Sequence, residues 1–367
     1  MKLHMNLLHG SPRLARLAGT AALTAGLAGT MASGAPAASA GVNFPVINQK
    51  AVIGWGANTG GQLGNGTRND STLPGSASGL VSGIVQVAAG FSHGLALRTD
   101  GTVWAWGNNR NGQLGNGVIS EAQLTPVQVT GLSGVTKIAA GGTFSLALRK
   151  DRTVWAWGNN TYGELGNGTT ADSSVPVQVT GLSQVTSIAA GGDPGSSFAI
   201  RISSTGVTSL WAWGDNSRGE LGDGTLNAHS TPEQVTGFSV PGIAGISAGD
   251  AFAFLLGTDG SVWAWGLDDA GQLGNAPSPQ GSNRPIRTIA PGSGITQLAA
   301  GVTHALAVRS NGTVLAWGDN TRGELGDGSR AAASGPVQVT GLTSASQVSA
   351  GSRFSLAVGE LPAVGSP

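Results

Sequence analysis

The dipeptide Trp-Gly returns six times along this chain and constrains its fold more than any other feature. The six tryptophans stand 51 to 56 residues apart, at Trp55, Trp106, Trp157, Trp213, Trp265 and Trp317. A Gly-(Gln/Glu)-Leu-Gly segment follows each of them, and an Ala-Gly pair comes later in every repeat. A period of this length is typical of arrays built from one repeated supersecondary unit. We therefore divide the chain into six repeats, at about 51–99, 100–150, 151–205, 206–258, 259–310 and 311–358.

Each repeat predicts four short strands. In the second repeat, residues 103–106 read Val-Trp-Ala-Trp, a β-branched and aromatic run that ends at Gly107. Residues 126–129, 135–140 and 145–149 are the next three candidate strands. Both faces of these strands are apolar or small, which suits sheets packed between two neighbours. The pattern predicts an all-β fold, a β-propeller with four antiparallel strands in each blade.

Two-residue turns link consecutive repeats. Asp100-Gly101, Asp259-Gly260 and Asn311-Gly312 favour hairpins because both central residues of such turns need positive φ. Strands joined by a hairpin belong to one sheet, so the first strand of each repeat should complete the blade of the repeat before it. The strand at 52–55 has no preceding hairpin, and the strand at 354–358 has no following one. We expect these two strands to pair and to close a ring of six blades.

The first forty residues differ from the repeats. Lys2, Arg13 and Arg16 are basic, an apolar run of small residues and Leu follows at 17–32, and Ala-Ser-Ala ends at Ala40. This order is typical of a secretory signal peptide cleaved after Ala40. The apolar run is too short and too rich in Gly and Ala for a confident membrane span, and the alternative is a disordered or anchoring N-terminus. The expected organisation is a signal peptide at 1–40, a linker at 41–50, one propeller at 51–358 and a tail at 359–367.

Composition excludes several classes of protein. The 62 glycines of the 367 residues follow no three-residue period, which excludes collagen and indicates many tight turns. The chain has no cysteine, so its core alone must hold the fold. Without the three basic residues of the signal peptide, 16 basic residues stand against 19 acidic ones, a formal charge of −3. That charge argues against nucleic-acid binding, and no later apolar stretch predicts contact with a membrane.

The repeat resembles that of the regulator-of-chromosome-condensation family. The resemblance rests on Asp-Gly-x-Val-x-x-Trp-Gly at 100–107, Asn-x-x-Gly-Gln-Leu-Gly at 109–115 and Ala-Ala-Gly-x-x-His-x-Leu-Ala-Leu at 88–97. It covers nearly all of residues 51–358. The resemblance implies a β-propeller, usually of seven blades, but the residues outside the six repeats are too few to form a seventh.

One segment matches a catalytic motif. Residues 90–94 read Gly-Phe-Ser-His-Gly, which fits the Gly-x-Ser-x-Gly turn that carries the nucleophile of many hydrolases. That turn needs a helix after it, and the other repeats have no serine at this place. His93 and His304 stand where Phe144 and Phe252 stand in other copies, so we expect this position to pack a flat ring into the core.

We therefore expect no catalytic residue, no metal site and no cofactor. Only three histidines follow residue 40, no carboxylates cluster with them, and cysteine is absent. Gly54-x-Gly56 lacks the rest of a dinucleotide fingerprint.

Positions that vary between the copies are the candidates for binding. Strands one and three of a blade run parallel, so the loops after Trp-Gly and after Ala-Gly should emerge on one face. Tyr, Phe, Arg and Asp appear there, and a rigid frame that carries such side chains suits a protein interface. The candidate partner-binding residues are Phe91, Asn111, Tyr162, Asp193, Arg218, Asp250, Arg322 and Arg353.

These observations predict a secreted, monomeric, non-catalytic scaffold that binds a protein partner, with inhibition of an extracellular enzyme as one form of that function. The chain resembles exported bacterial members of the repeat family, such as a secreted β-lactamase inhibitor, in its signal peptide and repeat strands. The resemblance does not extend to the loop residues, so it names no target. The alternatives are guanine-nucleotide exchange, the activity of the founding member, and a structural role at the cell surface. The signal peptide and the charge of −3 argue against exchange.

Overall fold

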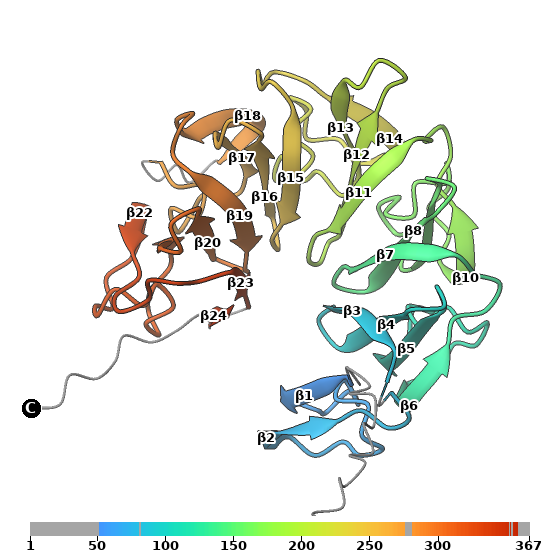
Figure 1. Cartoon of the computed structure of the whole chain (residues 1–367). Coiled ribbons are helices and arrows are strands. Elements are labelled where there is room, and N and C mark those ends of the chain that lie inside the picture. The colour runs from blue at the N-terminus through green and yellow to red at the C-terminus, as the bar shows by residue number, and fades with distance from the viewer. Residues whose placement is uncertain (1–50, 81, 276–280, 352, 354, 359–367) are drawn as a thin grey trace, which may run out of the picture. The chain divides into compact units, whose positions relative to one another are not determined.

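Every element of regular structure in the described residues is a β-strand (Figure 1). The computed structural model describes residues 51–80, 82–275, 281–351, 353 and 355–358. The expected signal peptide, linker and tail lie outside these residues. The described part of the chain contains no helix with the length and apolar character that a membrane crossing needs.

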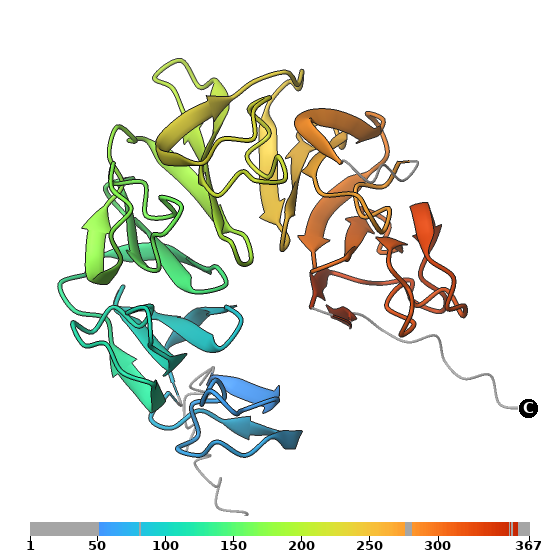
Figure 2. The same cartoon turned by 180° about the vertical axis from the view of Figure 1, so that it is seen from behind.

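Five sheets have four antiparallel strands each, and Figure 2 shows the same sheets from behind. They are β3 (Ile84–Ala89), β4 (His93–Arg98), β5 (Val103–Asn108) and β6 (Ala122–Gln128); β7 (Val135–Ala140), β8 (Phe144–Arg149), β9 (Val154–Gly158) and β10 (Ser173–Gln178); β11 (Val185–Ala190), β12 (Ser196–Ile202), β13 (Thr208–Gly214) and β14 (His229–Val235); β15 (Ile243–Ala248), β16 (Phe252–Gly257), β17 (Val262–Gly266) and β18 (Ser282–Ile289); and β19 (Ile295–Ala300), β20 (His304–Arg309), β21 (Val314–Gly318) and β22 (Ala333–Gln338). Two further sheets have two strands, β1 (Ile53–Gly56) with β2 (Ser71–Ser76) and β23 (Gln347–Ala350) with β24 (Ser355–Val358).

Each four-stranded sheet takes two strands from each of two consecutive repeats. The β4–β5 hairpin links the first two repeats, and its strands pair antiparallel. In its turn, Asp100 Oδ1 accepts hydrogen bonds from Thr102 N at 3.0 Å and from Thr102 Oγ1 at 2.6 Å. The prediction that the first strand of a repeat joins the sheet of the repeat before it is confirmed. The second strand of the repeat belongs to that same sheet.

The second strand of a repeat begins earlier than predicted. β6 starts at Ala122 rather than at Pro126. Its pairing with β5 is irregular between Ala105 and Gly107, and Pro126 lies opposite this irregularity. Proline has no N–H to give to a ladder, so an outer strand with a bulge accommodates it.

The core lies between consecutive sheets, where a tryptophan of one repeat binds the backbone of the repeat before it. Trp157 Nε1 donates to the carbonyl of Gln113 at 2.8 Å, and Trp213 Nε1 donates to that of Glu164 at 2.8 Å. Trp106, Trp265 and Trp317 do the same to Gln62, Glu220 and Gln272. The acceptor is always the Gln or Glu of the Gly-(Gln/Glu)-Leu-Gly segment. This bond explains why the two landmarks recur together.

The Ala-Gly pairs mark a second contact between sheets. Gly192 N donates to Gly249 O at 3.0 Å, and Asp250 N donates to Gly301 O at 3.3 Å, so backbone bonds join neighbouring sheets directly. A Cβ added to Gly249 would lie 2.5 Å from Gly301 O and 2.6 Å from the Phe252 ring. The pattern therefore requires glycine here because two backbones approach closely.

We predict that Gly249→Ala lowers the free energy of unfolding by about 1–3 kcal/mol, since the new methyl group must push backbone or a buried ring aside. Gly245→Ala is the matched control in the same strand region, because a Cβ there meets nothing within 4 Å. Urea denaturation of both variants measures the difference. Equal stabilities would contradict the close-contact explanation.

The predicted pairing of the first and last strands is not among the strand pairs of the described residues. β1 pairs with β2, and β23 pairs with β24, in two separate sheets. Each of these two sheets has two strands, half the number in the other sheets. Closure of the ring stays a prediction.

Candidate functional site

All eight predicted binding residues lie at one edge of the sheets, which we call the loop edge. It consists of the turns after Ala-Gly and the loops after Trp-Gly. Backbone bonds hold the two kinds of loop together within a sheet, as Asn108 N donates to Ser92 O at 2.7 Å and Asp215 N donates to Gly195 O at 2.9 Å. The loops therefore form a continuous frame on the ends of the strands.

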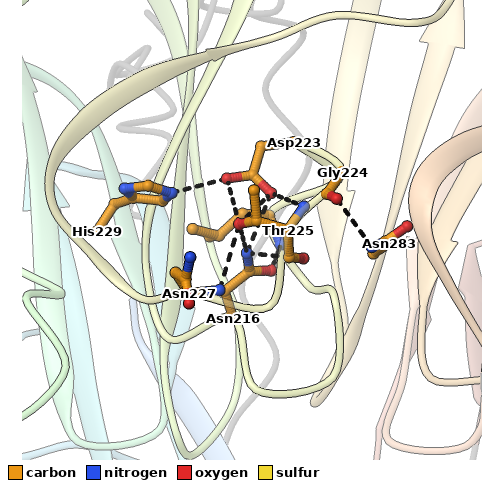
Figure 3. A network of polar contacts seen from close by, with 8 residues as sticks. Asn216, Asp223, Gly224, Thr225, Asn227, His229 and Asn283 are labelled. Carbon is orange, nitrogen blue, oxygen red and sulfur yellow. Dashed lines mark hydrogen bonds and ion pairs between the residues drawn. The ribbon is translucent and has the colours of Figure 1, made fainter.

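One buried residue organises each long loop, an asparagine in five loops and Asp268 in the sixth. Asn216 Oδ1 accepts from Leu221 N at 3.0 Å, and Asn216 Nδ2 donates to Asp223 Oδ1 at 3.1 Å and to Thr225 O at 3.2 Å (Figure 3). The same acceptor bond to a leucine N–H recurs at Asn58, Asn109, Asn160 and Asn320, and at Asp268. Hydrogen bonds within each loop thus fix its backbone, so the residue type at its tip can differ between copies.

The loop between β13 and β14 carries further polar contacts. His229 Nε2 lies 2.7 Å from Asp223 Oδ2, and Asn283 Nδ2 of the neighbouring sheet donates to Gly224 O at 3.0 Å (Figure 3). Burial alone would raise the pKa of Asp223, but hydrogen bonds from Thr225, His229 and Asn216 hold it below its ordinary value. These contacts fix the loop that carries Arg218.

The tips of the loops expose apolar side chains. Of the predicted binding residues, Phe91 is 51% exposed and Tyr162 is 42% exposed. The prediction missed Val118, Ile119 and Leu226, which are 53%, 63% and 59% exposed. They lie in the second half of the long loops, where the copies also differ, so comparison of the copies at that register could have found them.

The structure brings two of the predicted residues into contact, and the charge of a third acts on one of them. Asp193 N donates to Asp250 Oδ1 at 3.3 Å. Burial raises the pKa of the Asp250 carboxyl, repulsion from Asp193 adds to the rise, and the positive charge of Arg218 opposes it. Asp250 and Phe91 also line a cavity of about 710 Å³, whose wall is formed by the Ala-Gly ends of all six repeats.

The other predicted residues lie apart from this group. Arg322 and Arg353 line a second cavity of about 350 Å³ beside β24. Asn111 Nδ2 donates to Asp172 Oδ2 at 3.4 Å.

The charge of the loop edge is concentrated in three consecutive sheets. Between β9 and β18, the turns and loops of the loop edge carry one basic residue, Arg218, in their described part. They carry nine acidic residues, which we call the acidic sector: Glu164, Asp172, Asp193, Asp215, Glu220, Asp223, Asp250, Asp268 and Asp269. The remaining turns and loops of this edge hold five acidic and five basic residues, at Asp70, Glu121, Asp319, Glu324, Asp327, Arg68, Arg110, Arg322, Arg330 and Arg353. The net charge of this edge therefore belongs to the acidic sector.

Four members of the acidic sector are buried, namely Glu164, Asp215, Glu220 and Asp268, and the two glutamates make the same hydrogen bond. Glu164 Oε2 accepts from Tyr162 N at 2.9 Å, and Glu220 Oε2 accepts from Arg218 N at 2.8 Å. Burial raises the pKa of each to about 7 despite these bonds, and Asp215 adds repulsion at both. Three other repeats place Gln62, Gln113 and Gln272 here and make the same bond with an uncharged oxygen.

We predict that Glu164→Gln with Glu220→Gln stabilises the chain at pH 8 by about 1–3 kcal/mol. A carboxyl with a folded pKa of about 7 and an ordinary value of 4.5 favours folding at low pH and loses that contribution as pH rises from 4.5 to 7. Denaturation at pH 4.5 and pH 8 measures the effect, which should be much smaller at pH 4.5. A gain that does not depend on pH would contradict the assignment.

The two core histidines bridge neighbouring sheets. His93 is buried, and its Nε2 lies 3.0 Å from Ser145 Oγ, which donates to Gln113 O at 2.9 Å. His304 Nε2 lies 3.0 Å from Ser355 Oγ in the same way. Burial lowers the pKa of His93 to about 4. The structure thus places His93 in an inter-sheet contact and away from solvent.

No group of three or more His, Cys, Asp or Glu side chains is arranged to hold a metal ion within the described residues.

The fold and this edge define a repeat-built β-propeller that presents variable loops on a fixed frame. The family model described as "Regulator of chromosome condensation (RCC1) repeat" matches residues 51–97, 100–148, 151–194, 209–256, 259–308 and 311–358. The chain belongs to the regulator of chromosome condensation repeat family.

Two curated relatives show the breadth of this family. The chain is 33% identical to the ultraviolet-B receptor UVR8 of Arabidopsis thaliana over 281 residues, which cover 76% of this chain and 62% of that protein. It is 32% identical to the E3 ubiquitin-protein ligase HERC2 of Homo sapiens over 336 residues, which cover 87% of this chain and 7% of the ligase. The chain therefore spans less than two thirds of the length of either relative.

Solved structures share the fold. Human WBSCR16 superposes with a TM-score of 0.72 at 23% identity, covering 84% of this chain and 81% of that one. Prp20p of Saccharomyces cerevisiae, described with its binding properties to Gsp1p and histones, gives a TM-score of 0.61 at 21% identity, covering 86% of this chain and 93% of that one. At these identities the likeness shows the fold alone.

Proposed function

We propose that this chain is an exported, non-catalytic scaffold that binds a protein partner through its loop edge. The observation that carries the proposal is that the bonds that support the loops recur between the copies, whereas the exposed residues at the loop tips differ. The buried asparagine and its bonds recur from loop to loop, whereas exposed residues such as Tyr162, Arg218 and Leu226 differ between copies. Support that recurs from copy to copy, with tips that differ, is the arrangement of a binding surface.

The acidic sector supports a partner with a basic surface. Complementary charge steers association and selects partners more than it adds affinity. The exposed Tyr162 and Leu226 lie in loops of this sector and supply apolar contact area beside the charges. A protein partner also agrees with the relative Prp20p, which is described as binding Gsp1p and histones.

The sequence at 1–40 supports export, so the partner should be sought outside the cell. Inhibition of an extracellular enzyme follows if the bound face of the partner contains its active site. A rigid face that covers a substrate cleft blocks catalysis without any chemistry of its own.

A pull-down from native culture medium, with residues 41–367 as bait, tests this function. We predict that one protein is captured by the unchanged bait and lost with the variant Tyr162→Ala, Arg218→Ala, Arg322→Ala. A variant at the opposite edge, Thr99→Ala with Thr258→Ala, serves as the control and should retain the partner. If the captured protein is an enzyme, its activity should fall on addition of the chain.

Thermal unfolding of the baits confirms that they are folded before the capture is interpreted. Equal capture by the triple variant would move the interface away from the loop edge. No capture by any folded bait at low salt would favour a structural role at the cell surface.

We also propose that β1 and β2 complete a sixth blade with β23 and β24. Leu356 in β24 is 45% exposed, whereas Leu95, Leu146 and Leu306 at the same register are 0%, 0% and 2% exposed. Val87 in β3 is 55% exposed, whereas Ile138 at its register is 3% exposed. Closure of the ring would bury these side chains as the other sheets bury theirs, and apolar burial favours it.

Paired cysteines test the closure, because the chain has no cysteine of its own. Leu95 lies opposite Ala105 and Leu146 lies opposite Ala156, so Leu356 should lie opposite Gly54. We predict that Gly54→Cys with Leu356→Cys forms an intramolecular disulfide under mild oxidation, seen as a mass loss of two hydrogens and a shift on non-reducing gels. Ile53→Cys with Leu356→Cys is the control, since neighbouring residues of a strand point to opposite faces. A disulfide between chains would contradict closure within one chain.

A further inference from the structure

The opposite edge of the sheets carries a concentrated positive charge. This hairpin edge consists of the hairpins β4–β5, β8–β9, β12–β13, β16–β17 and β20–β21 and the loops beside them. Five basic residues gather at and beside its β8–β9 and β12–β13 hairpins, and we call them the basic patch: Lys137, Arg149, Lys150, Arg152 and Arg201.

Hydrogen bonds show that the segments bearing these residues are neighbours. Val185 N donates to Arg152 O at 3.2 Å, and Ile202 N donates to Gln184 O at 3.0 Å. Arg152 Nη1 also donates to Gln184 Oε1 at 3.1 Å. Lys137 Nζ donates to the carbonyl of Thr186 at 2.9 Å, so β7, the β8–β9 hairpin and the sheet of β11 and β12 meet here.

Two arginines of the basic patch are held in place by tryptophans. The guanidinium of Arg149 lies over the Trp155 ring at 5.7 Å, and that of Arg201 lies over Trp211 at 5.9 Å. Stacking fixes the plane of a guanidinium and leaves its N–H edge able to bind a carboxylate, as Arg149 does with Asp151 at 3.3 Å. Arg149 is also anchored by the bond from its Nε to Ser133 O at 3.0 Å.

The one acidic residue among these groups is already engaged. Asp151 lies 3.3 Å from Arg149, and its Oδ1 accepts from Thr153 N and Thr153 Oγ1. The Thr153 hydroxyl is the main cause that holds the pKa of Asp151 below its ordinary value, so this carboxylate stays charged and bound to its own turn. Lys150 and Arg152, beside it, are exposed.

The acidic sector lies at the other ends of overlapping sheets. β9 runs from the hairpin edge at Val154 to the loop edge at Gly158, so a strand length of roughly 17 Å separates the two charged surfaces. That is beyond the screening length of about 8 Å at physiological ionic strength. The basic patch and the acidic sector therefore cannot neutralise each other within one molecule.

We propose that the basic patch binds the acidic sector of a second copy of this chain, head to tail. The complementary charges are both present on the chain. The basic patch has five basic residues, and five members of the acidic sector are at least partly exposed: Asp172, Asp193, Asp223, Asp250 and Asp269. The contact occupies the loop edge that the proposed function assigns to the partner, so self-association would compete with partner binding.

The association should be weak and sensitive to salt, because exposed ion pairs contribute little and are screened. A head-to-tail contact leaves one free surface of each kind on a pair of chains, so the assembly grows with concentration instead of stopping at a dimer. At high salt the chain should be a monomer, which is the state that the sequence predicts.

Analytical ultracentrifugation of residues 41–367 tests the proposal. At about 20 mM salt the weight-average mass should rise steadily with protein concentration, and at about 0.5 M salt it should return to that of the monomer. Lys150→Glu with Arg152→Glu should abolish the rise. Arg287→Glu with Arg309→Glu makes the same change in net charge outside the basic patch and should retain it.

A mixing experiment separates this contact from general electrostatic attraction. Asp193→Lys with Asp269→Lys removes charge from the acidic sector but keeps the basic patch, and this variant alone should be monomeric. Mixed in equal amounts with the Lys150→Glu, Arg152→Glu variant, it should form a complex of two chains and no larger species, because only one pair of intact surfaces remains.

Two results would overturn the proposal: a monomeric unchanged chain at all concentrations in low salt, or a mixture of the two variants that stays monomeric. Neither result bears on the capture of a partner, whose test uses different variants and the culture medium. Circular dichroism of each variant shows that the sheets are intact.

Discussion

The bond from a tryptophan indole to the carbonyl of a Gln or Glu in the preceding repeat is the contact on which the rest of this fold depends. It joins the first strand of one repeat to the long loop of the repeat before it, 44 to 49 residues earlier in the chain. A buried indole N–H without a partner would cost free energy, so the bond fixes the spacing between sheets as well as adding to their attraction.

The same Gln or Glu residue also supports the tip of the loop, through its side chain. Its oxygen accepts the N–H of the residue two places earlier, which is Tyr162 or Arg218 in the two repeats with a raised glutamate pKa. The core contact and the presentation of the loop tip thus share one residue. A charged Glu in this place weakens the fold near neutral pH, whereas Gln makes the same bonds without that cost.

The two edges of the sheets differ in charge because different parts of the repeat build them. Long loops with Asn, Asp and Glu form the loop edge, and short hairpins preceded by Arg form the hairpin edge. Strand direction separates these segments along every blade. A nearly neutral chain therefore presents one acidic and one basic surface, and its net charge of zero gives no sign of either.

The sequence by itself determined the repeat, the strands and the sharing of sheets between repeats, because these follow from backbone preferences at glycines, hairpin turns and β-branched or aromatic runs. It also placed the candidate binding residues at one edge, since strand direction alternates. Only the tertiary structure decided that Asp193 contacts Asp250 and that the charge of Arg218 acts on the Asp250 carboxyl. It also decided that Val118, Ile119 and Leu226 are exposed and that Glu164 and Glu220 are buried. These properties depend on how closely residues from different repeats pack, and no local pattern in the chain encodes a distance across two sheets.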